Sequence, residues 1–230
     1  MHFLHSRQIW NAYPHLVPGV VHATGIGSAP VSPPQLDRFY AIAKARLERS
    51  AEGDLPEIQS WRRTFSAMGL KATQYRCASE SLLRRFRKDG ALPSIHPLID
   101  LCNAISLAFA IPVAVFDTSC IADYLEVRHA DGSEIYLPFE GRPENPGAGE
   151  IVFADAANRA HARRWTNRQS SLSAVRNDTA AILIVAEALH DTALSDIERL
   201  TRTIVQELES WWPAEVDSRI LNPDSPRFDF

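Results

Sequence analysis

The sequence lacks the features that mark secreted, membrane-spanning and repeat proteins. Its 230 residues include only three cysteines, Cys77, Cys102 and Cys120, and no pair has C-x-x-C spacing. This pattern predicts reduced thiols in a cytoplasmic protein, with neither a disulfide framework nor a zinc site. No apolar run reaches membrane-spanning length, and the first ten residues do not form a secretory signal. The sequence has no internal repeat and no low-complexity segment.

Motifs for covalent, metal and phosphate chemistry are also missing. There is no G-x-S-x-G, no H-E-x-x-H, no glycine-rich phosphate loop, and no Cys–His or Ser–His pair at a recognisable spacing. We therefore expect no metal, no cofactor and no covalent intermediate. The formal net charge is −4, so any contact with nucleic acid must come from local basic patches. Neither DNA nor a membrane is expected as a partner.

Residues 92–117 are the most informative stretch. Apolar residues at spacings of three and four predict a helix over 98–111, bounded by a proline on each side. A short buried strand is predicted over 113–117. The helix is apolar on nearly every side, so Asp100 and Asn103 need partners, either as structural pins or facing a ligand.

The remaining segments give the fold class. Helices come first, then strands, then one helix, which predicts an α+β fold with helices packed on one side of a mainly antiparallel or mixed sheet. Further helices are predicted over 32–47, 57–68, 79–90 and 192–212, the last with a capping box formed by Ser195 and Glu198; strands over 19–24, 124–129, 134–137, 150–154 and 180–186; and a loose tail over 213–230.

The 92–117 stretch resembles the editing domain of the phenylalanyl-tRNA synthetase β subunit, the B3/4 domain, and free-standing proteins made of that domain alone. The matching residues are Ile95, Leu98, Ile99, Asp100, Leu101, Asn103, Pro112, Phe116 and Asp117. The resemblance implies an α/β sandwich formed as a single domain over 1–230. Its core is expected over about 57–190, with an N-terminal extension, 1–55, and a C-terminal helix and tail, 192–230.

A second stretch, A-R-R-W-T-N-R-Q-S-S at 162–171, is similar to an R-R-W-x-x-R-x-S pattern in the free-standing proteins. Arg163, Arg164, Trp165 and Arg168 are predicted to form a basic, aromatic patch that stacks a base or grips phosphates of tRNA. The alternative is a surface loop with the tryptophan packed on a core edge. The synthetase domain has a glycine-rich turn here instead.

A third feature is a carboxylate that follows the apolar strand. The synthetase domain has a Thr, a buried strand and then a Glu that reads the substrate. Counting from Thr179 places that Glu at Val185, and Glu187 lies two residues further, on the same face of the strand. Burial of this carboxylate requires a cation or donors. A cationic substrate would provide them, and so would Arg76 or Arg164.

The synthetase domain also has a His where this sequence has Ala114, so the resemblance assigns no general base. Hydrolysis of an activated ester needs only a positioned water and a polarised carbonyl. The candidate residues are Asn103, His96 and Ser106 for catalysis; Cys102, Asp117, Glu187 and Ser94 for the amino acid; and Arg163, Arg164, Trp165 and Arg168 for the tRNA 3′ end.

The function that the resemblance implies is hydrolysis of mischarged aminoacyl-tRNA in trans. The absent His and glycines, together with the available carboxylates, favour canavanyl-tRNA(Arg) as the substrate. The alternatives are deacylation of tyrosyl- or meta-tyrosyl-tRNA(Phe), a non-catalytic tRNA-binding module that uses 162–171 and the arginine-rich helix 79–88, and a small-molecule binding protein that has lost the chemistry.

Overall fold

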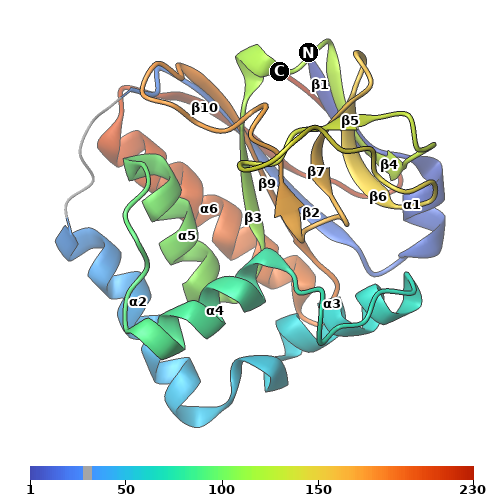
Figure 1. Ribbon diagram of the computed structural model, residues 1–230. Coiled ribbons are helices and arrows are strands. Elements are labelled where there is room, and N and C mark those ends of the chain that lie inside the picture. Colours follow the sequence, from blue (N-terminus) through green and yellow to red (C-terminus); the bar gives the residue numbers. More distant parts are fainter. Residues whose placement is uncertain (28–32) are drawn as a thin grey trace.

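The computed structural model describes residues 1–27 and 33–230, and within them helices and two β-sheets (Figure 1). The α-helices are α1 (Arg7–Ala12), α2 (Pro33–Arg49), α3 (Pro56–Ala67), α4 (Ala78–Asp89), α5 (Pro97–Phe109) and α6 (Ala193–Trp211). The strands are β1 (His2–His5), β2 (Val17–Thr24), β3 (Val113–Asp117), β4 (Tyr124–His129), β5 (Ile135–Tyr136), β6 (Ile151–Asp155), β7 (Arg159–Arg163), β8 (Arg168–Gln169), β9 (Ala181–Ala188), β10 (Glu215–Ile220) and β11 (Arg227–Asp229). None of the described helices is long and apolar enough to cross a membrane.

The sheets have different topologies. The smaller one has the order β10-β2-β9-β3 and is antiparallel throughout. The larger one has the order β11-β1-β4-β6-β7-β5, with β8 added to β7. In it, β1 is parallel to β4 and β5 is parallel to β7, so this sheet is mixed. The predicted α+β class and the helix–sheet packing are confirmed.

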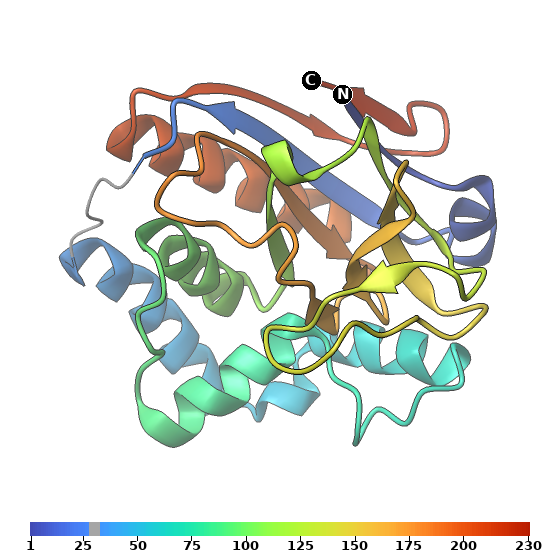
Figure 2. The ribbon, with the colours of Figure 1, turned by 45° about the horizontal axis from the view of Figure 1, so that its top comes forward.

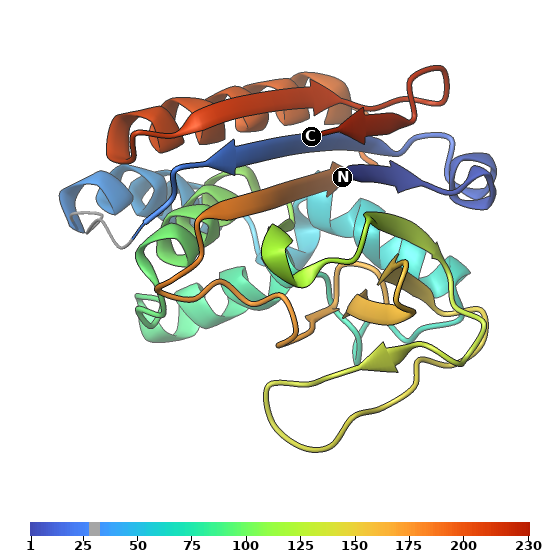
Figure 3. The same ribbon diagram turned by 90° about the horizontal axis from the view of Figure 1, so that it is seen from above.

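The smaller sheet lies between two hydrophobic cores, and β9 contributes to both. Ile182 and Ile184 pack with residues of α5 and α6 on one face. Leu183 and Val185 belong to the other core, shared with the larger sheet and with α1, α3 and α4. Both faces of β9 are therefore covered, which explains why its sequence is continuously apolar and not alternating. Figure 3 shows β10, β2 and β9 side by side, with α6 running along them.

The helices begin and end where the prolines and glycines indicate. The helix predicted over 98–111 is α5, and the strand predicted over 113–117 is β3. Both lie within two residues of their predicted bounds. Gly90, with φ +74°, ends α4 in the left-handed conformation. The predicted start of α2 at Ser32 lies outside the described residues.

Two predictions about the last 40 residues are wrong. Residues 213–230 are not a loose tail, because β10 pairs with β2 and β11 pairs with β1. The side chains of these strands are mostly polar, so the sequence shows no clear hydrophobic alternation there. Pairing with β2 and β1 provides most of their contacts. The capping box is also absent: Ser195 Oγ donates to the Thr192 carbonyl, while Thr192 Oγ1 donates to Asp196.

The two ends of the chain form part of the core. The terminal amine of Met1 donates to the Phe230 carbonyl at 2.9 Å, and the termini lie side by side in Figures 1 and 2. β1 lies between β11 and β4, and Phe3 and Phe228 are both buried. The segment expected to be an N-terminal extension therefore provides an interior strand of the larger sheet.

We predict that Phe228→Ala destabilises the protein by about 3–5 kcal/mol, the usual cost of removing a buried phenylalanine. A loose tail would give almost no effect. The free energy of unfolding in urea measures this. Phe139→Ala is the matched control, because that ring is 67% exposed; equal, small changes in the two variants would contradict the role of β11 in the core.

Candidate functional site

A small cavity opens where β3, β9 and the segment after β7 meet. Its volume is about 60 Å³. The walls are mainly apolar, with polar groups at Glu187 and along 166–169. The lining residues are Ala78, Pro112, Val113, Ala114, Phe153, Ala162, Trp165, Thr166, Asn167, Arg168, Gln169, Val185 and Glu187. Val185 and Glu187 both line it, as their spacing along one face of the strand predicts.

The Glu187 carboxylate is the main polar feature of this cavity. It is only 2% exposed, and two donors reach it through one oxygen. Trp165 Nε1 donates to Oε1 at 2.9 Å, and His5 Nε2 lies 2.7 Å from the same atom. No described residue donates to Oε2. The carboxylate is therefore anchored on one side and keeps an acceptor for another group.

A tight turn after β7 places Trp165 on the core side. Arg164 and Trp165 both have left-handed backbones, with φ of 47° and 56°. Such conformations are costly for non-glycine residues and persist only where the surroundings hold them. The indole is fully buried and makes edge contacts with Tyr13 and Trp61, with ring centroids 4.8 and 5.0 Å away. Trp165 therefore does not present its ring to a base, and the core-edge alternative describes its position.

The first two arginines of the segment are engaged within the protein. Arg163 is buried and makes a bidentate pair with Glu150, at 2.8 and 2.9 Å, and a further contact with Glu144 at 2.5 Å. The guanidinium of Arg164 lies over the Tyr75 ring, 4.8 Å from its centroid. The predicted basic patch is thus divided, and Arg163 is not available to phosphates in this structure.

Arg168 is the exposed cation of the segment. It lines the cavity and also an adjoining surface depression of about 360 Å³ that includes Tyr136 and Phe139. Within the described part of the chain it forms no ion pair. Its neighbour Gln169 is tied to β3, because Nε2 donates to the Val115 carbonyl at 2.5 Å. An exposed guanidinium therefore lies at the opening of a cavity that has a carboxylate on its wall.

Comparisons with known proteins identify the family of this chain. The model of the B3/4 domain family matches residues 60–215. The chain belongs to the B3/4 domain family. A solved structure of an N-terminal fragment of the phenylalanyl-tRNA synthetase β subunit from Pyrococcus horikoshii is similar, with 10% sequence identity and a TM-score of 0.46, over 93% of this chain and 49% of that one. The chain thus spans about half of that fragment. No curated protein matches the chain.

The α5 residues of this B3/4 domain do not reach the cavity. Cys102 packs in the core between α5, α6 and the far face of the smaller sheet, where burial raises its pKa to about 12. Ser106 is buried and donates to the Ile111 carbonyl at 2.6 Å. Asn103 is half-buried and does not line the cavity. The sheet separates the helix core from the wall that carries Glu187.

The loop before α5 has a structural role as well. His96 is buried at the N-cap, where Nδ1 accepts from the Leu98 amide at 3.3 Å, and burial lowers its pKa. Asp100 accepts from Ser94 Oγ at 2.6 Å and from the Ile95 amide at 2.8 Å. Of the two roles considered for Asp100, the structure shows the pin.

Asp117 is held by three intramolecular hydrogen bonds. It accepts from the Ser119 amide at 2.9 Å, from Ser119 Oγ at 2.6 Å and from Thr179 Oγ1 at 2.6 Å. The pair of Asp117 and Thr179 joins the end of β3 to the turn before β9. Neither residue lines the cavity, so of the predicted amino-acid ligands only Glu187 does.

His5 is the site residue that sequence reasoning missed. The predicted partners of the buried carboxylate are Arg76 and Arg164, but the structure places His5 and Trp165 there. His5 lies 182 positions from Glu187 in the chain. A single histidine in an unassigned N-terminal strand carries no local signal of such pairing.

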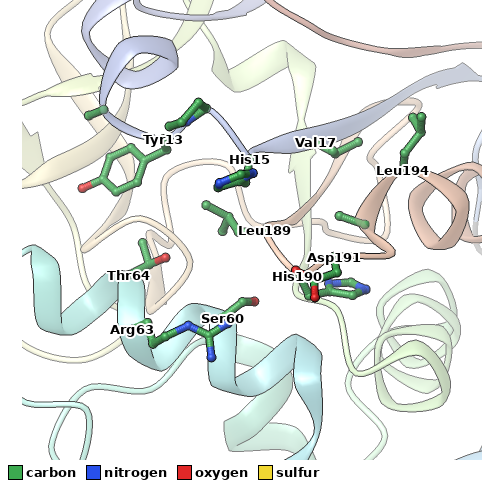
Figure 4. Close-up of a pocket in the computed structure, with 13 residues that line it drawn as sticks. Tyr13, His15, Val17, Ser60, Arg63, Thr64, Leu189, His190, Asp191 and Leu194 are labelled. Carbon is green, nitrogen blue, oxygen red and sulfur yellow. The ribbon is translucent and has the colours of Figure 1, made fainter.

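The structure has a second, larger cavity, and Figure 4 shows the residues that line it. Its volume is about 550 Å³, and it is formed by the α1–β2 turn, α3 and the connection from β9 to α6. His15, Arg63, His190 and Asp191 provide polar groups on its wall. Tyr13 lines this cavity and also contacts Trp165, which lines the smaller one.

We predict that Trp165→Phe lowers stability by about 1–3 kcal/mol, because a buried carboxylate loses one of its two donors. Trp211→Phe is the matched control: that indole also donates to a carboxylate, Glu207 at 3.3 Å, but is half-buried, so water can replace it. Urea unfolding of both variants measures the difference. A smaller loss for Trp165→Phe than for Trp211→Phe would contradict the anchoring role.

Proposed function

We propose that this B3/4 domain hydrolyses the ester of mischarged aminoacyl-tRNA in trans, with canavanyl-tRNA(Arg) as the preferred substrate. The observation that carries the proposal is the Glu187 carboxylate on the wall of the small cavity. Family membership supports the reaction class, since the resemblance is to an editing domain. The carboxylate supports the choice of substrate.

The volume and the lining of the cavity suit the planar end of a guanidino-oxy side chain. Glu187 keeps Oε2 free of intramolecular donors, and Val185, Phe153 and Ala162 provide apolar walls. A planar group with several N–H donors matches a carboxylate well. A volume of about 60 Å³ suits the few heavy atoms at the end of a side chain better than a complete aromatic ring.

Discrimination against arginine follows from desolvation. The guanidino-oxy group of canavanine is much less basic than the guanidinium of arginine, so it enters an apolar cavity with less loss of hydration. Two donors already occupy Oε1 of Glu187, so a fully charged guanidinium is underpaired there. Specificity then comes from rejecting the charged competitor as much as from binding the substrate.

The proposed hydrolysis needs no protein base at position 114. Water attacks the ester carbonyl, the bond from the carbonyl carbon to the ribose oxygen breaks, and that oxygen takes a proton to leave as the free tRNA hydroxyl. The neighbouring ribose hydroxyl relays the proton, and binding supplies the orientation. Arg168 at the opening contacts the terminal phosphates.

A tRNA-binding module without catalysis is the second candidate, and Ala114 favours it by placing a methyl group where a base would act. The arginine-rich helix α4 contributes little to this alternative. Arg84 and Arg87 contact Glu52, and Arg85 contacts Asp89. Much of the positive charge of that helix is thus paired within the protein.

We predict that the wild-type protein releases amino acid from canavanyl-tRNA(Arg) faster than from arginyl-tRNA(Arg), and that Glu187→Gln reduces this ratio at least tenfold, because an amide makes no charge-assisted pair. Release rates from a panel that includes tyrosyl- and meta-tyrosyl-tRNA(Phe) measure it. Glu126→Gln, a half-buried carboxylate outside the cavity, is the control.

The reaction class and the preferred substrate are tested separately. Faster release from the tyrosyl esters, with Glu187→Gln silent on canavanyl-tRNA, contradicts the substrate and keeps the deacylase. Binding of every tRNA without release contradicts the enzyme and favours the module. His5→Gln removes one contact of the Glu187 carboxylate but leaves every cavity-lining residue unchanged. Comparing its release rate with its stability therefore shows whether a loss of activity comes from unfolding or from lost recognition.

We predict that Arg168→Ala weakens tRNA binding and lowers the slope of log K against log salt by about 0.7 for one phosphate contact on a single strand. Arg202→Ala on α6 removes the same charge from an exposed position and serves as the control. Filter binding or fluorescence titration at several salt concentrations gives the slope. Identical slopes for the two variants would place the tRNA elsewhere.

A further inference from the structure

Three separate elements bring Glu57, His190 and Asp196 together beside the larger cavity. Glu57 lies in the first turn of α3, Asp196 in the first turn of α6, and His190 follows β9. One ligand atom from each of the three residues lies within 4.8 Å of the other two. His190 also lines the cavity of about 550 Å³, and Figure 4 shows it beside Asp191.

The hydrogen bond between His190 and Asp196 fixes the state of the imidazole. His190 Nε2 lies 2.9 Å from Asp196 Oδ2, which also accepts from Thr192 Oγ1 at 2.6 Å. An ionised carboxylate can only accept, so Nε2 carries the proton and Nδ1 presents a lone pair in the neutral ring. His190 is only 6% exposed, and Nδ1 has no hydrogen-bond partner.

Glu57 carries the second unmatched acceptor. Its Oε1 accepts from Arg46 at 2.6 Å, whereas Oε2 is buried without a partner. Glu57 is 8% exposed. A buried acceptor without a donor is destabilising, so two of them in one cluster point to a group from outside the chain that completes it.

We propose that Glu57 Oε2 and His190 Nδ1 bind a divalent transition-metal ion of the zinc class, while Asp196 holds the imidazole through its other nitrogen. Imidazole and carboxylate are ligands that zinc accepts, and water completes its coordination where the protein provides fewer than four ligands. A carboxylate behind the histidine is the usual support of a metal-bound imidazole. This site is independent of the proposed deacylation.

The surrounding charges tune the affinity of the site. Arg46 contacts Glu57 Oε1, and Arg199 lies 3.4 Å from Asp196 Oδ1. These cations hold the carboxylates in position and offset part of their charge, so the ion binds less tightly than it would between unpaired carboxylates. When bound, the ion joins the start of α3 to the segment after β9, which Asp196 in turn ties to α6, and it therefore stabilises the fold.

The test is titration of the metal-free 230-residue protein with Zn²⁺ by calorimetry, together with thermal unfolding with and without the ion. We expect one ion per chain and a higher melting temperature in Zn²⁺. His190→Gln and Glu57→Gln should each weaken binding at least tenfold and abolish the shift in melting temperature. His15→Gln is the matched control, since His15 lines the same cavity outside the cluster.

The nitrogen resonances of His190 keep the proposal testable if a variant folds poorly. In the wild-type protein, Zn²⁺ should shift the Nδ1 signal while Nε2 keeps its proton. Absence of 1:1 binding, binding retained in both folded cluster variants, or an unchanged Nδ1 signal at saturating Zn²⁺ would overturn the proposal. A water bridging the two acceptors then accounts for the cluster.

Discussion

The fold depends on how a buried carboxylate is satisfied. Glu187 lies near the end of a strand covered on both faces, and it is stable there because His5 and Trp165 both reach Oε1. Those partners come from the first strand of the chain and from a left-handed turn more than 150 residues later. One carboxylate therefore joins the larger sheet, the smaller sheet and the 163–169 segment. The same anchoring leaves Oε2 to the cavity, so the fold and the proposed recognition use different oxygens of one residue.

The double coverage of the smaller sheet also decides which predicted site residues can act together. Side chains alternate along β9, so Val185 and Glu187 face the larger sheet while Ile184 faces α5 and α6. The cavity forms on the first face only. Cys102 packs against the second face and is separated from Glu187 by the sheet itself. A motif that is continuous in sequence, from the loop before α5 to the end of β3, is thus divided between two sides of the molecule.

Secondary structure could be predicted from the sequence where the residues of the element itself carry the pattern. Prolines mark both ends of the helix that became α5, and a long apolar run marks β9, so these elements were predicted to within two residues. The strands β1, β10 and β11 were not predicted, because they are short or polar and exist through pairing with distant segments. The candidate site followed the same division. Glu187 was selected by counting along the strand from Thr179, as the family resemblance suggests, and strand periodicity placed it on the face of Val185. The position of Trp165 depends on two positive φ angles that the string R-R-W does not reveal.

The distribution of positive charge explains how a chain of net charge −4 can expose an arginine beside the cavity without having an extended basic patch there. Arg163 is held by Glu144 and Glu150, and Arg62 is held by the buried Glu80, at 2.6 Å. Guanidinium groups paired in this way add little to the external field. Arg168 is exposed and outside these pairs, at the opening of the Glu187 cavity. A single cation beside a small cavity does not hold a polyanion by attraction alone, since each phosphate contact contributes only one released counterion or fewer. In the proposed deacylation, selectivity for an aminoacylated tRNA therefore comes from the group that enters the cavity, and this makes Glu187, more than the arginines around it, the proposed determinant of the substrate.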